Sequence, residues 1–116
     1  MLRSRSYTSP VSEHLLVLTT VGNEEDALFL ARALVERRLA ACVNVLPSVR
    51  SLYRFRGVLE DENEHLLVIK TRADRYDALA AAVEELHPYE VPELVAMPIV
   101  RGAERYLAWV NDSVGP

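Results

Sequence analysis

Residues 14–38 read HLLVLTTVGNEEDALFLARALVERR, and this stretch decides the fold class. It opens with a short, continuous apolar run that ends in β-branched residues, which is typical of a strand buried on both faces. Gly22 and Asn23 then interrupt the pattern. We therefore expect a strand over residues 14–20 that leads directly into a helix.

The second part of this stretch has the start, body and end of a helix. Asn23 is a favoured N-cap residue, and the three acidic residues after it complement the positive end of the helix dipole. Arg37 and Arg38 suit a last turn. The apolar residues at helical spacing, which we expect on the buried face, are Ala27, Leu28, Ala31, Leu34 and Val35.

Strand character returns over residues 39–46, and Pro47-Ser48 predicts a kink or bulge rather than an end. Residues 49–56 then alternate with a period of two, as in an exposed strand. The acidic residues 60–64 are typical of a hairpin tip or an exposed strand start. Residues 66–69 are apolar at consecutive positions, which predicts a strand covered on both sides.

The last third of the chain repeats the helix-then-strand order. Asp74 is placed to cap a second helix, and the prolines of residues 87–93 end it, because proline excludes the helical conformation there. Residues 94–100 predict a fourth strand, which Pro98 confines to an edge or a bulge. A short C-terminal helix follows Gly102 and carries Tyr106, Leu107, Trp109 and Val110.

The resulting order, β-α-β-β-α-β plus a terminal helix, predicts an α+β fold of the ferredoxin-like kind, in which two helices cover one face of an antiparallel sheet. Its 116 residues fit one domain, which we place at residues 14–113. Residues 1–13 have no apolar core that would make them a secretory signal, and we expect a disordered N-terminal tail.

A sheet of this kind leaves one face without helices, yet its first and third strands are apolar on both faces. An exposed face of that size would be unusual on a monomer. The second strand region, residues 39–56, is also longer than usual and could extend past its own domain to pair with a neighbour. We therefore expect a cyclic homo-oligomer with sites between subunits.

Composition narrows the classes of partner. A net charge of −4 argues against a protein that binds nucleic acid or anionic membranes. The apolar run nearest the N-terminus, residues 15–18, is too short to span a bilayer. The one cysteine, Cys42, excludes an intramolecular disulfide, and its apolar neighbours favour core packing over reactivity. These features fit a cytoplasmic protein.

The segment from His87 to Glu93 (HPYEVPE) concentrates functional side chains between two prolines. His87, Glu90 and Glu93 are the candidate ligands of a divalent metal, although His87 also fits a helix C-terminus, where the dipole favours it. Tyr89 and Glu90 fit hydrogen bonds between subunits, or acid–base chemistry. The stiffness of the segment restricts all of these groups to a few positions.

Other candidates are spread along the chain. Lys70 follows an apolar run and must reach solvent or pair with a carboxylate such as Glu64. Tyr53, Phe55 and Trp109 either line a pocket or belong to a core or interface. A stripe of arginines on the long strand forms a solvated face or an anion site, and it consists of Arg50, Arg54 and Arg56.

A series of short motifs runs along the chain from about residue 14 to residue 113. They are Ala31-Arg32, Leu34-Val35-Glu36, Arg38 to Asn44, Ser51-Leu52-Tyr53, Gly57, Glu64, Lys70-Thr71, His87-Pro88-Tyr89-Glu90, Pro92-Glu93, Gly102, Tyr106-Leu107 and Trp109. In order and spacing, these motifs resemble the CutA family of divalent-cation tolerance proteins.

The resemblance implies a ferredoxin-like trimer, similar in architecture to the PII signalling proteins, located in the cytoplasm and linked to copper and other divalent-metal tolerance. Thr19 and Leu86 stand where some members have a copper-ligating cysteine and a second histidine, and Phe55 replaces a tryptophan. Tight copper(I) binding, which needs soft ligands, is therefore not expected.

We compare three possible functions with these observations. The first is a trimeric, non-enzymatic protein that binds copper, another divalent cation or a small ligand weakly in clefts between subunits. The second is a PII-like signalling or interaction module that binds an anion or nucleotide, although the chain has no glycine-rich phosphate loop. The third, an enzyme, lacks any recognisable nucleophile arrangement and is not expected.

Overall fold

The structure is a computed structural model that describes residues 13–115. Of the tail predicted for residues 1–13, only Glu13 therefore lies within the described residues, and its carbonyl accepts a hydrogen bond from the Ala73 amide at 2.8 Å. The elements in chain order are β1 (His14–Val21), α1 (Glu24–Glu36), β2 (Cys42–Phe55), β3 (Val58–Arg72), the 3₁₀ turn η1 (Ala73–Arg75), α2 (Tyr76–Leu86), β4 (Val95–Pro98) and α3 (Glu104–Ser113).

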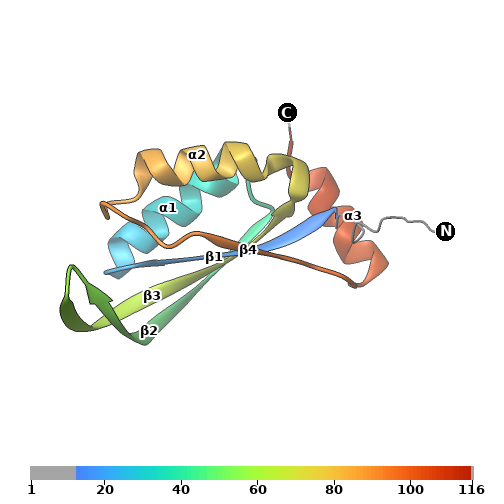
Figure 1. Cartoon of the computed structure of the whole chain (residues 1–116). Coiled ribbons are helices and arrows are strands. Elements are labelled where there is room, and N and C mark those ends of the chain that lie inside the picture. Colours follow the sequence, from blue (N-terminus) through green and yellow to red (C-terminus); the bar gives the residue numbers. More distant parts are fainter. Residues whose placement is uncertain (1–12, 116) are drawn as a thin grey trace.

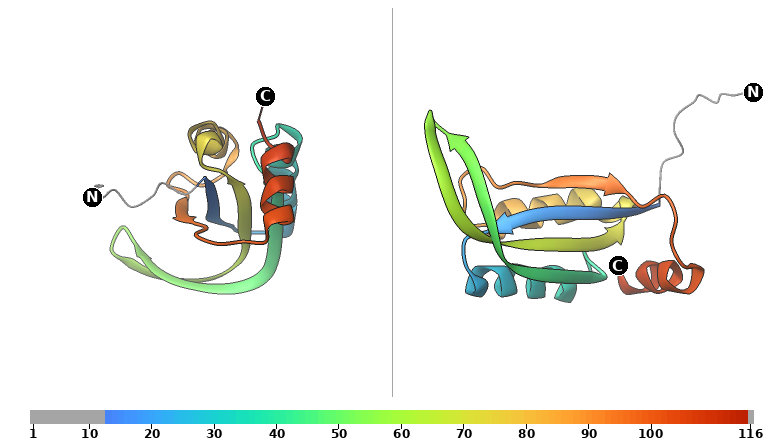
Figure 2. Two further views of the ribbon diagram at one scale, coloured as in Figure 1. Left: turned by 90° about the vertical axis from the view of Figure 1, so that its right-hand side faces the viewer. Right: turned by 90° about the horizontal axis from the view of Figure 1, so that it is seen from below.

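The strands form one antiparallel sheet in the order β2-β3-β1-β4, and α1 and α2 lie side by side on one of its faces (Figure 1). This confirms the predicted α+β class and element order. Figure 2 shows the β2–β3 hairpin reaching past the helices at one end of the molecule, with α3 beyond the other end. No helix among residues 13–115 is long and apolar enough to cross a membrane.

The core lies between the sheet and the two helices. Val17 and Val21 of β1 and Leu67 and Ile69 of β3 are fully buried, because they point at the helices. The residues of the opposite face, such as Leu18, are only half-buried in the single chain. The helices cover one face of these strands, so burial of the second face depends on the predicted contact with another subunit.

Helix α1 begins as predicted, because the Asn23 side chain accepts a hydrogen bond from the Asp26 amide at 2.8 Å. Its buried face differs from the prediction at three residues: Leu30 joins the core, while Leu28 and Val35 are exposed. Both exposed residues lie toward the edge strand β2, where they line a groove with Val43 and Val45.

Two predicted roles of charged residues at helix ends are wrong. Arg37 and Arg38 follow α1 and do not form its last turn. Arg38 has a positive φ of 59°, and its guanidinium donates hydrogen bonds to the carbonyls of Asp112 and Gly115 at the end of α3. Asp74 caps no helix, because its carboxylate accepts two hydrogen bonds from the Arg72 guanidinium instead.

The bulge predicted at Pro47-Ser48 is confirmed. Leu46 pairs with Leu66 and Val49 pairs with Glu64, so β2 has one more residue than β3 between these two pairs. Ser48 has a positive φ of 61°. The strand then continues to a tight turn at Arg56 and Gly57, whose positive φ values of 52° and 81° match a type I′ hairpin.

Candidate functional site

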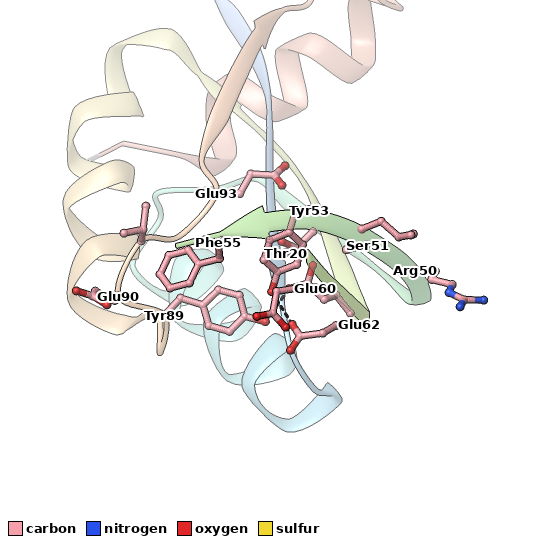
Figure 3. Close-up of a pocket in the computed structure, with 13 residues that line it drawn as sticks. Thr20, Arg50, Ser51, Tyr53, Phe55, Glu60, Glu62, Tyr89, Glu90 and Glu93 are labelled. Carbon is pink, nitrogen blue, oxygen red and sulfur yellow. Dashed lines mark hydrogen bonds between the residues drawn. The ribbon is translucent and has the colours of Figure 1, made fainter. Parts of the chain in front are cut away.

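A cleft of about 760 Å³ lies between the outer part of the β2–β3 hairpin and the segment 87–93 (Figure 3). Its walls are aromatic and acidic. The residues that line it are Thr20, Arg50, Ser51, Leu52, Tyr53, Phe55, Glu60, Glu62, Glu64, Tyr89, Glu90, Val91 and Glu93.

The bulge in β2 determines which of its side chains share a face of the sheet with the glutamates of β3. Before the bulge, odd-numbered residues of β2 pair with odd-numbered residues of β3, and after it Tyr53 pairs with Glu60 and Ser51 with Glu62. Paired residues in an antiparallel ladder share a face of the sheet. The extra residue therefore turns Tyr53 onto the same face as the glutamates, where an unbroken strand would place the neighbouring arginines.

Segment 87–93 is held against β1 by its histidine. His87 is buried, and its Nε2 lies 2.8 Å from the Thr20 carbonyl while its Nδ1 accepts the Tyr89 amide at 3.1 Å. These partners require the neutral tautomer with hydrogen on Nε2. The ring therefore positions the segment that follows it, through both of its nitrogens.

The predicted metal ligands do not form a cluster. The Glu90 carboxylate forms an ion pair with Arg56, with 2.7 Å between Oε1 and Nη2, and Glu93 is exposed at the cleft wall. Among residues 13–115, no group of three or more His, Cys, Asp or Glu side chains is arranged to hold a metal ion. Because His87 also has both nitrogens engaged, the set His87, Glu90 and Glu93 does not fit a metal in this arrangement.

Tyr89 and Glu64 meet at the inner end of the cleft. The phenol donates a 2.6 Å hydrogen bond to Glu64 Oε2, and the glutamate is only 4% exposed. Gly22 makes room for this pair, because a Cβ atom there would lie 3.1 Å from the Tyr89 hydroxyl. Burial and the Glu64 carboxylate raise the pKa of Tyr89, so the phenol keeps its proton at neutral pH.

A second phenol–carboxylate pair lies beside the first. Tyr53 donates a 2.7 Å hydrogen bond to Glu62 Oε1, and this bond raises the pKa of Tyr53 to about 12. Glu64 and Glu60 act in the same direction through their charges. The two tyrosines are therefore hydrogen-bond donors to carboxylates, and they are poor general bases.

Three candidates lie outside the cleft. Lys70, which was expected to reach solvent or pair with a carboxylate, donates to the side-chain amide oxygen of Asn44. Cys42 is half-buried, pairs with Lys70 across the β2–β3 ladder and lies away from the main core. Trp109 is 47% exposed on α3, with its ring 5.6 Å from that of Tyr106.

The arginine stripe is divided between separate partners. Arg50 makes two hydrogen bonds with Asp61, and Arg56 pairs with Glu90. Arg54 donates to the Gly57 carbonyl within the turn. The guanidinium groups therefore do not converge on one anion site.

Sequence reasoning did not identify Glu60 and Glu62 as site residues, because it treated the acidic residues as a hairpin tip. The alternation of Glu60, Glu62 and Glu64 was the available signal, since residues two apart share a face of a strand. Thr20 carried no such signal. It reaches the cleft only because segment 87–93 returns beside the end of β1.

Known proteins are similar to this chain along almost all of its described length. The model of the family described as CutA1 divalent ion tolerance protein matches residues 15–113. The divalent-cation tolerance protein CutA of Thermus thermophilus is 47% identical over 100 residues, which are 86% of this chain and 97% of that protein. A CutA homolog of Xenopus laevis is 50% identical over 95 residues, which are 82% of this chain and 63% of that longer protein.

Solved structures agree with the sequence matches. The Thermus thermophilus divalent cation tolerance protein superposes with a TM-score of 0.85 at 46% identity, over 88% of this chain and 99% of that one. CutA1 from Oryza sativa gives a TM-score of 0.87 at 39% identity, over 90% and 96% of the two chains. This chain belongs to the CutA1 family of divalent ion tolerance proteins.

Proposed function

We propose that this protein is a cytoplasmic, homotrimeric divalent-cation tolerance protein that binds copper or another divalent cation weakly at the carboxylates of its cleft and catalyses no reaction. The observation that carries the proposal is the acidic lining of the cleft in a chain of this family. The names of the relatives describe tolerance of divalent cations and no chemical reaction.

The bare face of the sheet supports an assembly of identical chains. Val95 and Met97 of β4 pair with Leu18 and Leu16 of β1 and remain 48% and 41% exposed. Leu46 of β2 shares this face and is 41% exposed. A continuous apolar face is costly in water, so a second and third copy of the chain are its natural cover.

The donor set of the cleft favours weak binding of a cation. Glu60 and Glu93 line the cleft and form no ion pair within residues 13–115. Carboxylate oxygens suit hard divalent cations, whereas copper(I) prefers sulfur ligands. Thr19, where some relatives are expected to have cysteine, is fully buried on the core face and does not line the cleft.

The same lining disfavours the alternative of an anion or nucleotide site. Among residues 13–115, five glutamates line the cleft, against one arginine, Arg50, which is already paired with Asp61. An incoming phosphate would meet like charge, which costs binding free energy. The protonated phenols at the inner end provide no general base, which is why no reaction is proposed.

Calorimetric titration with Cu²⁺ and Zn²⁺ tests the metal part of the proposal. We expect dissociation constants on the order of 10⁻⁴ M or weaker for the wild-type protein. The double variant Glu60→Gln/Glu93→Gln should weaken binding further, while His87→Ala should leave it unchanged if the fold is retained. A loss of metal binding in His87→Ala, with binding retained in the double glutamate variant, would show that His87 is a metal ligand and that the two glutamates are not.

Sedimentation equilibrium tests the assembly. The proposal requires a species of three times the chain mass of 13.1 kDa at micromolar concentration. A monomeric mass would contradict the trimer and leave the bare face unexplained.

A further inference from the structure

We infer that the inner end of the cleft binds an organic cation that carries N–H donors, a guanidinium or primary ammonium group, with Glu62 and Glu64 as its acceptors and the rings of Tyr53, Phe55 and Tyr89 as its walls. This inference rests on the proposed binding role of the cleft and names the class of ligand.

The first step is the buried charge of Glu64. Its side chain is more than nine-tenths buried and lines the cleft, and only its Oε2 is bonded, to the Tyr89 phenol. Within residues 13–115, Oε1 has no hydrogen-bond partner and no cation lies against the carboxylate. A buried charge without a counter-charge is costly, and a cation bound in the cleft would remove that cost.

The second step is that the negative charge is concentrated. Glu62 and Glu64 both raise the pKa of Tyr53, and both raise that of Tyr89, so the two carboxylates act on one small volume. No basic residue opposes them in either case. In the described part of the chain, the one basic residue that lines the cleft is Arg50, whose Nε and Nη2 are directed at Asp61.

The third step is the aromatic lining, which separates an organic cation from a bare metal ion. Three aromatic rings line the cleft, and Figure 3 shows the Tyr89 ring extending toward the carboxylates. A hydrated metal ion gains little from apolar ring faces, whereas a guanidinium or alkylammonium group gains a cation–π interaction and buries its alkyl part.

The chain itself contains an example of this chemistry at the mouth of the cleft. The Arg56 guanidinium lies 4.9 Å from the centroid of the Phe55 ring and donates a 2.7 Å hydrogen bond to Glu90. One aromatic face and one carboxylate thus hold a guanidinium, and both residues line the cleft. The inner end offers the same pair of groups, and no basic side chain among residues 13–115 forms an ion pair with Glu62 or Glu64 there.

The test compares charged and neutral ligands of the same shape on the wild-type protein. n-Butylguanidinium and its neutral isostere n-butylurea are titrated at millimolar concentration, with ¹H–¹⁵N NMR shifts of the assigned hairpin amides as the readout. We expect saturable shifts centred on residues 60–64 with n-butylguanidinium and at least tenfold weaker effects with n-butylurea. Equal responses to the two ligands, or shifts elsewhere, would overturn the inference.

Variants then locate the acceptor. Glu64→Gln keeps the size of the side chain and removes its charge, and it should weaken n-butylguanidinium binding about tenfold or more. Glu36→Gln removes one charge at the end of α1, outside the cleft, and should change the affinity less than twofold. An unchanged affinity in Glu64→Gln, with the spectrum of a folded protein, would exclude Glu64 as the acceptor.

The Cu²⁺ and Zn²⁺ titrations keep the two proposals distinguishable. Metal binding without n-butylguanidinium binding would overturn this inference and leave the proposed function in place. Binding of n-butylguanidinium without metal binding would support the inference and remove the metal from the proposed function.

Discussion

The base and the tip of the β2–β3 hairpin are built from the same two strands, but different forces hold them. At the base, Leu67 and Ile69 of β3 are fully buried beneath the helices. At the tip, Leu52 and Leu59 are 63% and 64% exposed, and side-chain pairs such as Arg50–Asp61 link the strands. Burial thus fixes the base, while the apolar side chains of the tip remain available for contacts outside their own chain.

Truncating one leucine in each region should separate these forces most clearly. Leu67→Ala leaves a cavity in the core and should lower the free energy of unfolding by about 2–5 kcal/mol, measured by urea denaturation. Leu52→Ala should cost less than about 0.5 kcal/mol within one chain. If Leu52 lies in a subunit interface, its truncation should instead weaken the oligomer in sedimentation equilibrium. Equal urea midpoints for the two variants would contradict the comparison.

Tyr89→Phe tests the link between the tip and the segment 87–93. It removes the donor to Glu64 and leaves that carboxylate buried without a partner, so we expect a loss of about 1–3 kcal/mol in unfolding free energy. The tyrosine absorbance near 295 nm during alkaline titration provides a second readout, because the variant should lose a phenol that ionises well above pH 10. A control variant, Tyr76→Phe, lies on α2 and should retain that late transition.

The raised tyrosine pKa values also fix the sign of the alkaline effect. Above pH 10, phenols in the unfolded chain lose protons that Tyr53 and Tyr89 keep in the folded state. The folded state then binds more protons than the unfolded state, so stability falls as the pH rises from about 10 through the folded pKa values. Tyr89→Phe should therefore make the loss of stability above pH 10 less steep.

Gly57→Ala tests how the tip is closed. Gly57 has a φ of 81°, and a Cβ atom there meets nothing within 4 Å, so the cost comes from the backbone alone. We expect a loss of about 1 kcal/mol, because alanine disfavours the left-handed region. Gly57→Asn is the matched control, since asparagine tolerates this region better and should cost less. A larger loss for asparagine would argue against a type I′ turn.

The smallest expected effect concerns the exposed ion pair of the tip. Hydrogen bonds from Arg50 lower the pKa of Asp61 below its ordinary value of 3.8. The stabilisation from this pair is therefore present above that value and lost as the pH falls through the folded pKa. Asp61→Asn should flatten the stability profile below pH 4, and 1 M NaCl should reduce the difference at pH 7. If the urea midpoints of both proteins fall equally steeply with pH, the Arg50–Asp61 ion pair does not stabilise the tip.

The fold was largely predictable because its signals are local. The Asn23 cap, the bulge at Pro47-Ser48 and the edge position of Pro98 each depend on backbone chemistry that one or two residues decide. The roles of Arg38 and Asp74 were not predicted correctly. Arg38 donates to a carbonyl 77 residues away in the sequence, and the Asp74 carboxylate binds the Arg72 guanidinium instead of a helix N-terminus.

The candidate site was predictable only in part. Tyr53, Tyr89 and Glu64 were named from the sequence, and the structure brings them together. The sequence could not show that His87 has both ring nitrogens engaged, because one of its partners is a backbone carbonyl 67 residues away. The hydrogen bond from Lys70 to Asn44 was not predictable for the same reason, since the two residues lie on different strands.

The bulge in β2 has a consequence for how such a chain can change over time. One extra residue decides whether tyrosine and phenylalanine or arginine and leucine share a surface with the glutamates of β3. A deletion of Ser48 would exchange these two sets in a single genetic event, without altering any side chain. The loss of one codon would therefore place arginines in place of aromatic rings opposite the same glutamates, and it offers designers a direct route from an acidic, aromatic lining to one of paired opposite charges.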